Sequence, residues 1–496
     1  MRVVVIGAGL GGLSAAAHLV GAGHEVFVFE RSSAPGGRAG VIEQHGFRLD
    51  TGPTVFTMPN LLADTFRAID RNMGDYVTID PVDPMYRAVF ADGSMMRVRH
   101  DRDEMTEEIR HFANAREAGA FNEFCEWLTE LYELEMPRFI DANYDSPVDQ
   151  AKRWRSLLDL IRHGGLGALD SKVASFFADE RLRWAFRFQA MYAGMAPRRA
   201  PAIYAVITYM ATVAGVYAPR RGMHSIATGL AQALTEAGAT IRYDAEVLRI
   251  LRDGDGAAIG VDLGGDDRLT SGAVVCNADL PVAYKTMLGG VEAPRVARRG
   301  RYSPSCLLWV AGVRGAPPDG AAHHNIHFGR DFDDAFKAVT KRGMRMPDPT
   351  TLVSIGSISD RSLAPDGCST LYALEPMPNL DGKLDWARNG ARYADDLRRR
   401  VGELGYPVDE VLVERVFDPL DWESMGMERG TPFSLSRTFR QSGPFRPRNI
   451  DKRVPGLVFT GSSTLPGVGV PMVLISGKLA AQRVDQYAST TSLLKW

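Results

Sequence analysis

Residues 3–30 read VVVIGAGLGGLSAAAHLVGAGHEVFVFE, and this stretch decides the fold of the chain. Residues 3–6 form a continuous apolar run, which is typical of a strand buried on both faces. A glycine-rich turn follows, then a helix predicted over residues 13–22 and a second buried strand over residues 25–29 that leads into Glu30. This order predicts a parallel α/β unit of the Rossmann type.

Each glycine of the turn has a separate physical role in such a unit. Gly7 permits a tight turn, Gly9 lets the backbone approach a pyrophosphate, and Gly12 lets the helix pack closely on the strand. The pyrophosphate would lie at the helix N-terminus, where free N–H groups point outward. Glu30 follows Gly12 by 18 residues and would accept hydrogen bonds from a ribose hydroxyl. A turn that only joined strand to helix would leave Glu30 unexplained, so the stretch predicts a dinucleotide site.

The loop after Glu30 indicates which dinucleotide is bound. Residues 31–38 read RSSAPGGR and place two further glycines and Arg38 directly after the acid. Such a loop can fold back over a diphosphate and give Arg38 an anionic partner. With this loop, the chain resembles the start of the flavin amine oxidase and phytoene desaturase superfamily. Residues 45–55, HGFRLDTGPTV, resemble the bacterial-type carotenoid desaturases in particular.

The C-terminus carries a second signal. Residues 456–461 read as a strand that ends in glycine, residues 462–470 as an irregular turn, and Pro471 as the first residue of a final helix. A helix that begins there presents free N–H groups to whatever lies beside the turn. The resemblance implies that this neighbour is the pyrimidine end of a flavin, whose negative charge on reduction the helix dipole would stabilise.

The resemblance implies FAD as the cofactor and identifies its binding residues. In one place the chain departs from the family pattern, which often has Arg-Gly-Gly before the helix near residue 224. This chain has Arg220, Arg221 and Gly222, so a side chain replaces the first glycine. The FAD-binding residues implied by the resemblance are Gly7, Ala8, Gly9, Gly12, Glu30, Arg31, Gly37, Arg38, Gly52, Pro53, Thr54, Val247, Asn277, Gly461, Val470 and Met472.

Length and composition agree with a folded enzyme of two or three lobes. The chain has 496 residues, which is too long for one core. Apolar residues make up 45% and charged residues 24%, and the net charge of −2 argues against nucleic acid as a partner. The four cysteines have no CxxC spacing, so we expect reduced thiols and a cytoplasmic protein. We expect no signal peptide, because the first apolar run is short and leads into the glycine turn.

One segment contains several possible metal ligands. Residues 323–327 read HHNIH, with no carboxylate or cysteine partner nearby. Zinc sites draw on such partners or on regularly spaced histidines. We therefore interpret the segment as an exposed loop and expect no metal site.

The middle of the chain predicts that the FAD-binding domain is discontinuous. Residues 257–263 and 269–276 read as a strand pair that completes a small sheet before the chain enters a further domain. The predicted fold is α/β, with a Rossmann-type FAD-binding domain, a discontinuous substrate domain and a helical insert that faces a membrane. We expect the FAD-binding domain in residues 1–100, 220–300 and 421–496, the insert in residues 101–219 and the substrate domain in residues 301–420.

Residues 200–219 form a stretch of twenty residues without a charge. Such a length could span a bilayer. Pro201, Gly215 and three tyrosines make the stretch only moderately hydrophobic. We therefore interpret it as a buried helix that lines an apolar tunnel.

A flavin beside an apolar tunnel suits a hydrocarbon substrate. A hydrocarbon has no polar group, so its binding would come from burial of apolar surface, which contributes a free energy of about 25 cal/mol per Å². The resemblance implies a FAD-dependent desaturase of a C40 carotenoid precursor, most simply phytoene converted stepwise towards lycopene. The reaction would transfer a hydride to the flavin and release a proton from the neighbouring carbon. Quinone or oxygen would then accept the electrons.

Asp159 and Arg162 are the candidate catalytic residues. They are spaced i,i+3 on a predicted helix and share its face. They align with a proposed Asp-x-x-Arg acid/base pair of the family. A surface ion pair explains the spacing equally well.

Two other classes of function stay open. Later-acting carotenoid desaturases and isomerases share this scaffold. The superfamily also includes non-catalytic carriers of prenyl lipids. A carrier has no need for the ribose acid, the loop of residues 31–38 and the flavin-end helix together, so the sequence favours an enzyme.

The expected substrate also implies a membrane surface as a partner. A carotenoid precursor dissolves in a bilayer and hardly at all in water, so we expect peripheral membrane association. The predicted docking surface is residues 149–221, where apolar side chains lie among arginines. These arginines are Arg153, Arg155, Arg162, Arg181, Arg183, Arg187, Arg198 and Arg199.

Overall fold

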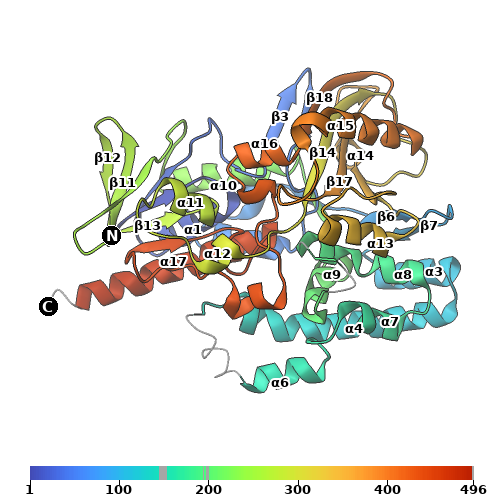
Figure 1. The fold of residues 1–496 in the computed structure, drawn as a ribbon, viewed down its shortest axis with the longest axis horizontal. Helices are drawn as coiled ribbons and strands as arrows, with labels where there is room; N and C mark the ends of the chain where they lie inside the picture. The colour runs from blue at the N-terminus through green and yellow to red at the C-terminus, as the bar shows by residue number, and fades with distance from the viewer. Residues whose placement is uncertain (145–153, 194, 197–199, 494–496) are drawn as a thin grey trace.

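The computed structural model describes residues 1–144, 154–193, 195–196 and 200–493. The fold is α/β, as predicted. Figure 1 shows an α/β region on the left, a second sheet with its helices at the upper right, and a lobe of helices at the lower right. The three regions are built from segments that alternate along the chain.

A five-stranded sheet lies at the centre of the α/β region. Its strand order is β19-β13-β1-β2-β9, and every pairing is parallel. The N-terminal, middle and C-terminal parts of the chain therefore all contribute to one sheet. The strands are β1 (Arg2–Ile6), β2 (Glu25–Phe29), β9 (Thr240–Arg242), β13 (Ala273–Cys276) and β19 (Leu457–Phe459).

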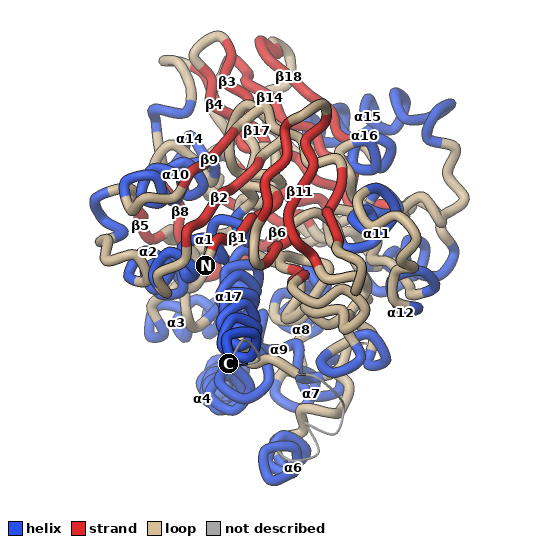
Figure 2. Tube along the Cα trace, turned by 90° about the vertical axis from the view of Figure 1, so that its left-hand side faces the viewer, coloured by secondary structure: helices blue, strands red, loops and turns tan. Residues whose placement is uncertain are grey.

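The apolar run of β1 is buried because both of its faces are covered. Val3 and Val5 pack with helices α1 (Leu10–Gly21), α10 (His224–Glu236) and α17 (Val470–Leu493). Val4 and Ile6 face the opposite side, where an antiparallel sheet covers them. Figure 2 shows the α1 and α17 helices lying close beneath the strands. The covering sheet consists of β10 (Arg249–Arg252), β11 (Ala258–Gly264) and β12 (Asp267–Thr270).

The prediction of a single strand over residues 269–276 is wrong. Strand β12 ends at Thr270 and stays in the small antiparallel sheet, whereas β13 begins at Ala273 and joins the parallel sheet between β1 and β19. The sequence changes from polar to apolar at this point. Residues 267–270 read DRLT and lie at an edge, while residues 273–276 read AVVC and are fully buried.

A seven-stranded mixed sheet forms the second layer. Its order is β18-β14-β17-β16-β15-β6-β7, and β15 pairs with β6 in parallel. The hairpin β6–β7 comes from the N-terminal part of the chain and extends a sheet built mainly after residue 300. The predicted domain boundaries stay predictions. The strands are β6 (Tyr86–Val89), β7 (Met95–Val98), β14 (Ser305–Arg314), β15 (His324–His327), β16 (Thr351–Ser354), β17 (Cys368–Met377) and β18 (Val411–Phe417).

The histidine-rich segment is a buried strand, and its prediction as an exposed loop is wrong. All four residues of β15 are buried, and each polar side chain has a partner in the protein interior. His324 Nδ1 lies 2.9 Å from Ser354 Oγ, and His327 Nε2 lies 2.9 Å from the Tyr406 hydroxyl. Burial lowers the pKa of His327 to about 3, so its ring is neutral. Among the described residues, no cluster of His, Cys, Asp or Glu could hold a metal ion.

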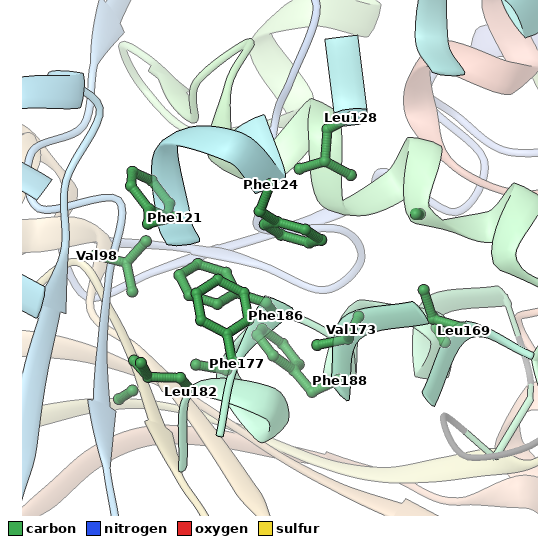
Figure 3. Close-up of a cluster of buried hydrophobic side chains, with 14 of the residues drawn as sticks. Val98, Phe121, Phe124, Leu128, Leu169, Val173, Phe177, Leu182, Phe186 and Phe188 are labelled. Carbon is green, nitrogen blue, oxygen red and sulfur yellow. The ribbon is translucent and has the colours of Figure 1, made fainter. Parts of the chain in front are cut away.

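The helical lobe packs around an aromatic core. Phe121 and Phe124 from one helix meet Phe177 and Phe186 from the opposite side, with ring centroids 5.2–5.6 Å apart (Figure 3). The helices are α3 (Arg102–Phe112), α4 (Ala115–Glu135), η2 (Met136–Ile140), α6 (Trp154–Arg162), α7 (Leu169–Phe176), α8 (Glu180–Ala185), η3 (Phe188–Ala193), η5 (Ala202–Tyr204) and α9 (Ala205–Thr212).

The sequence predicted one helix in residues 200–219, and this prediction is wrong. This stretch contains η5, the eight-residue α9 and strand β8 (Tyr217–Pro219), which pairs with β5 (Ile79–Pro81). Gly215 has φ +91°, a left-handed conformation that a helix does not allow. Within the described ranges, no helix combines the length and the apolar character needed to cross a bilayer.

The four cysteines lie in α4, β13, β14 and β17, and they are buried and free. The remaining elements connect these layers. They are β3 (Val41–Gln44), β4 (Phe47–Asp50), α2 (Pro59–Arg67), η1 (Met73–Asp75), α11 (Leu280–Thr286), α12 (Arg295–Arg299), α13 (Phe332–Lys337), η6 (Ala338–Arg342), α14 (Gly356–Ser359), η7 (Arg361–Leu363), α15 (Trp386–Glu403), α16 (Pro419–Ser424), η8 (Glu428–Gly430), η9 (Phe439–Gln441) and η10 (Gly443–Phe445).

Candidate functional site

A cavity of about 1310 Å³ begins at the carboxyl ends of the parallel strands and continues into the helical lobe. Residues that follow β1, β2, β13 and β19 line its first half. Ligands of open parallel sheets bind at this edge, because the loops and helix N-termini converge there. We call this half the nucleotide half and the part within the helical lobe the apolar half.

The glycine turn after β1 leaves no room for side chains. A Cβ atom added at Gly12 would lie 2.0 Å from the carbonyl oxygen of Gly7, so α1 packs directly on the turn. A Cβ atom at Gly9 would lie 2.8 Å from Nδ2 of Asn277, which follows β13. Gly7 itself has φ +93°. The bare backbone therefore forms one wall of the nucleotide half, and such a cradle fits a pyrophosphate.

Glu30 lies at the end of β2 and faces the same half of the cavity. Its Oε2 accepts a hydrogen bond from the Ala8 amide at 2.7 Å, and its Oε1 accepts one from the Ser32 amide at 2.9 Å. These bonds hold the carboxylate in place at the glycine turn. Each oxygen has a further lone pair that could accept a hydrogen bond from a ribose hydroxyl.

Arg38 brings a partly buried positive charge to the nucleotide half. Its Nη1 donates to the carbonyl oxygen of Pro432 at 3.0 Å, and its Nη2 lies 3.8 Å from Oδ2 of Asp279. Burial lowers the pKa of Arg38, and the Asp279 carboxylate partly opposes this shift. A partly buried cation near the glycine cradle suits an anionic ligand. The sequence prediction included Arg38 but not Asp279, although Asp279 follows Asn277 by only two residues.

The C-terminal turn closes the nucleotide half from the other side. Gly461 follows β19 with φ +96°, and its amide donates to Ser476 Oγ at 3.0 Å. Helix α17 begins at Val470, one residue before the predicted start at Pro471. Residues 470–473 line the cavity, so the free N–H groups of a 24-residue helix lie beside it.

The structure brings most of the sequence-predicted FAD residues together. Ala8 and Gly12 do not line the cavity: Ala8 holds Glu30 in place, and Gly12 allows α1 to pack on the turn. Their assignment to FAD stays a prediction. The predicted residues that line the cavity are Gly7, Gly9, Glu30, Arg31, Gly37, Arg38, Gly52, Pro53, Thr54, Val247, Asn277, Gly461, Val470 and Met472.

The turn of residues 220–222, where the chain departs from the family pattern, contacts Asp50 and does not line the cavity. Asp50 Oδ2 accepts a hydrogen bond from the Met223 amide at 2.8 Å. A Cβ atom at Gly222 would lie 2.6 Å from this oxygen, so the second glycine of the pattern is needed here. Arg221 adopts a left-handed conformation with φ +65°. The replaced glycine therefore affects the packing of this turn.

The apolar half of the cavity is lined by the helical lobe. Phe188, which also belongs to the aromatic core in Figure 3, lies at its wall. The other apolar side chains here are Phe139, Ile140, Leu157, Leu160, Leu166, Met191, Ile203, Val206, Ile207 and Met210. Two polar groups that the sequence analysis missed also line the cavity, the carboxyl of Glu135 and the guanidinium of Arg437.

Asp159 and Arg162 lie on α6 and form an exposed ion pair. Arg162 Nη1 is 3.4 Å from Asp159 Oδ1, and the Arg162 side chain is 74% exposed. Neither residue lines the cavity, whereas Leu157 and Leu160 of the same helix do. Their predicted role in proton handling stays a prediction.

Comparison with known proteins identifies the family. Residues 10–485 match the family of flavin containing amine oxidoreductases. The chain belongs to this family. The glycine cradle, Glu30 and Arg38 fit the cofactor that the family implies, so the protein is a FAD-dependent oxidoreductase.

Similar proteins cover nearly the whole chain. A phytoene dehydrogenase from Streptomyces griseus is 46% identical over 97% of this chain and 95% of its own length. A zeta-carotene-forming phytoene desaturase from Myxococcus xanthus is 37% identical over 98% of this chain and 94% of its own. Cyclohexylamine oxidase from Brevibacterium oxydans has a TM-score of 0.61 at 15% identity, covering 98% of this chain and 99% of that one, and so shares the fold.

The Glu30→Ala variant should bind FAD more weakly than wild type. The change removes a charged acceptor, and hydrogen bonds to charged groups contribute about 1.5–3 kcal/mol each, so we expect roughly a tenfold to hundredfold loss of affinity. Titration of apoprotein with FAD measures this affinity. Glu25→Ala is the matched control, because Glu25 starts the same strand and forms an exposed pair with Arg2. Equal affinity in Glu30→Ala and Glu25→Ala would contradict the assignment.

The Asp159→Asn variant tests the predicted acid/base pair. If Asp159 handles a proton, turnover should fall by roughly 10²–10⁴-fold while FAD still binds. Steady-state turnover with FAD titration as the control measures both. A turnover rate within twofold of wild type would show that Asp159 and Arg162 form only a surface ion pair.

Proposed function

We propose that the protein desaturates a C40 carotenoid precursor, most simply phytoene, and converts it stepwise towards lycopene. One observation carries the proposal: a single cavity joins the glycine cradle to an apolar region within the helical lobe. A long hydrocarbon could lie in the apolar half with one of its bonds beside the flavin. The names of the relatives from Streptomyces griseus and Myxococcus xanthus support this substrate class.

The residues of the chain bind, orient and shield such a substrate. FAD supplies hydride acceptance when bound. The aliphatic and aromatic side chains of the apolar half bind the hydrocarbon by burial, at about 25 cal/mol per Å² of apolar surface. The same side chains exclude water from the reacting carbons. The N-terminus of α17 provides a fixed positive potential where the flavin becomes negative on reduction.

Other functions remain as alternatives on the same scaffold. A later-acting carotenoid desaturase or isomerase would use the same cavity with a more conjugated substrate. A prenyl-lipid carrier would need the apolar half but not Glu30 and Arg38 in the nucleotide half. Quinone or oxygen is the proposed acceptor for the electrons that the flavin collects.

Incubation of the holoprotein with phytoene in vesicles tests the function. Without oxygen or added quinone, phytoene should bleach the flavin absorbance, and addition of the acceptor should yield products with more conjugated double bonds. Anaerobic spectroscopy and chromatography of the products measure the two steps. A carrier would bind phytoene and leave the flavin oxidised, which would contradict the proposal.

We further propose that α6 docks the protein on a membrane. Its side chains Trp154 and Ile161 are 55% and 49% exposed, and Figure 1 shows the helix projecting at the lower edge of the helical lobe. Leu157 and Leu166 are both exposed and line the cavity, so the exposed apolar surface continues into the apolar half. A hydrocarbon could pass between bilayer and cavity there without crossing water.

The docking surface is narrower than the sequence predicted. Arg187 is buried and its Nη2 lies 2.7 Å from Asp333 Oδ2, so it cannot face lipid headgroups. Arg181 pairs with Asp179 at 2.7 Å, and Arg183 donates to the carbonyl oxygen of Phe177 at 2.7 Å. Arg155 and Arg162 on α6 are exposed. Of the other predicted arginines, Arg153, Arg198 and Arg199 lie outside the described residues.

The double variant Trp154→Asp/Ile161→Asp should lose membrane binding. The two carboxylates would oppose burial in the interface and repel anionic headgroups. Sedimentation with vesicles of phosphatidylglycerol should recover wild type in the pellet and the variant in the supernatant. Leu412→Asp is the matched control, because Leu412 is an exposed apolar residue on β18. Equal recovery of both variants in the pellet would contradict docking through α6.

A further inference from the structure

Glu135 is a buried acid in an apolar environment. It is the last residue of α4, is 5% exposed and lines the cavity. Its Oε1 is fully buried and has no hydrogen-bond partner among the described residues. A buried polar group without a partner destabilises the fold, so native proteins rarely keep one without a use for it.

The position of Glu135 distinguishes it from the other acids of the cavity. Among the described lining residues, the acids are Glu30, Glu135, Glu246 and Asp279. Glu30 and Asp279 lie in the nucleotide half beside the glycine turn and Arg38, and Glu246 is exposed. Glu135 is thus the carboxyl that the helical lobe provides, and its neighbours Phe139 and Ile140 belong to the apolar half.

Glu135 also lies near the flavin end of the cavity. Tyr132 and Met136, its neighbours on α4 and η2, pack with Met472 and Ile475 at the start of α17. Tyr204, whose hydroxyl forms a hydrogen bond with Ser442, also lies near Glu135. A carboxyl between α17 and the apolar half is placed where substrate carbons would lie beside the flavin.

Among the described residues, none of the charged groups around this end of α4 forms an ion pair with the Glu135 carboxyl. Burial raises the pKa of Tyr204, and the nearby Glu135 carboxylate adds to the rise, while Arg437 and Arg446 oppose it. Burial alone raises the pKa of Glu135 well above its ordinary value. The other titratable groups on the packed elements include Tyr132 and Tyr209, Glu130 and His163, Arg138, Asp159 and Arg162, Lys172, Asp141 and Lys478, and the exposed Glu133.

We propose that Glu135 is the base that accepts the proton released in each desaturation. The proposal rests on the proposed function. In one concerted step, an allylic carbon would give up a hydride to bound FAD while the C–H bond on the neighbouring carbon breaks. Its proton forms an O–H bond with the Glu135 carboxylate, and its electron pair becomes the second bond of the new alkene. In an apolar cavity the proton needs such an acceptor.

The Glu135→Gln variant should slow flavin reduction while binding FAD normally. The amide keeps the shape of the side chain but cannot accept the proton, so the anaerobic rate of flavin bleaching by phytoene in phosphatidylcholine vesicles should fall by roughly 10²–10⁴-fold. Glu133→Gln is the matched control, because Glu133 is an exposed acid two residues away on the same helix. It should react at the wild-type rate.

The pH profile and the thermal midpoint separate catalysis from a structural role. The carboxylate form is the active base, so the wild-type rate should rise with pH through a pKa above the ordinary value of 4.5. In Glu135→Gln the rate should not show this rise with pH. Glu135→Leu should melt at the same temperature as wild type or higher, because it removes an unpaired polar group. A structural role would instead lower the midpoint.

Two outcomes would overturn the proposal. If wild type bleaches with phytoene and Glu135→Gln reacts within twofold of it with the same pH profile, Glu135 is not the base, although the proposed function stands. If wild type itself does not bleach with phytoene, the proposed function fails and the role of Glu135 fails with it.

Discussion

The structure depends on the close approach of three chain segments around Asn277. Cβ atoms added at Gly9, Gly11 or Gly461 would each lie 2.8 Å from an amide atom of this side chain. The Asn277 backbone amide also donates to the carbonyl oxygen of Ile6 at 2.9 Å. The turns after β1, β13 and β19 can therefore meet only because glycines occupy these positions. This contact brings the glycine cradle and the turn before α17 to the same cavity.

The two halves of the cavity differ in the charged groups that line them. Arg437 and Arg446 are buried at the cavity and Arg38 is partly buried there, and these cations suit the diphosphate of FAD. Burial and the charge of Arg437 lower the pKa of Arg446 to about 9. Among the described lining residues, the acid that the helical lobe contributes to the apolar half is Glu135. An anionic cofactor and a neutral hydrocarbon are thus separated by the chemistry of the walls as well as by position.

The sequence predicted the parts of the fold that local patterns encode. The glycine turn, β2 and Glu30 follow the expected spacing, and Pro471 lies one residue into α17. The errors concern segments whose state depends on distant partners. The HHNIH strand looks polar until Ser354 and Tyr406 are placed beside it. Residues 269–276 split because their two ends pair with different sheets. Glu135 was missed because an acid at the end of a charged helix gives no sign that it is buried.

The strand order has a consequence for synthesis of the chain. Strand β1 ends at Ile6, yet its sheet is completed by β19 and covered by α17, which begins at Val470. At typical translation rates of about 5–20 residues per second, roughly half a minute to a minute and a half separates these events. The N-terminal hydrophobic strands must stay unassembled or protected on the ribosome during that interval. The cofactor can therefore enter its complete site only after α17 has been made.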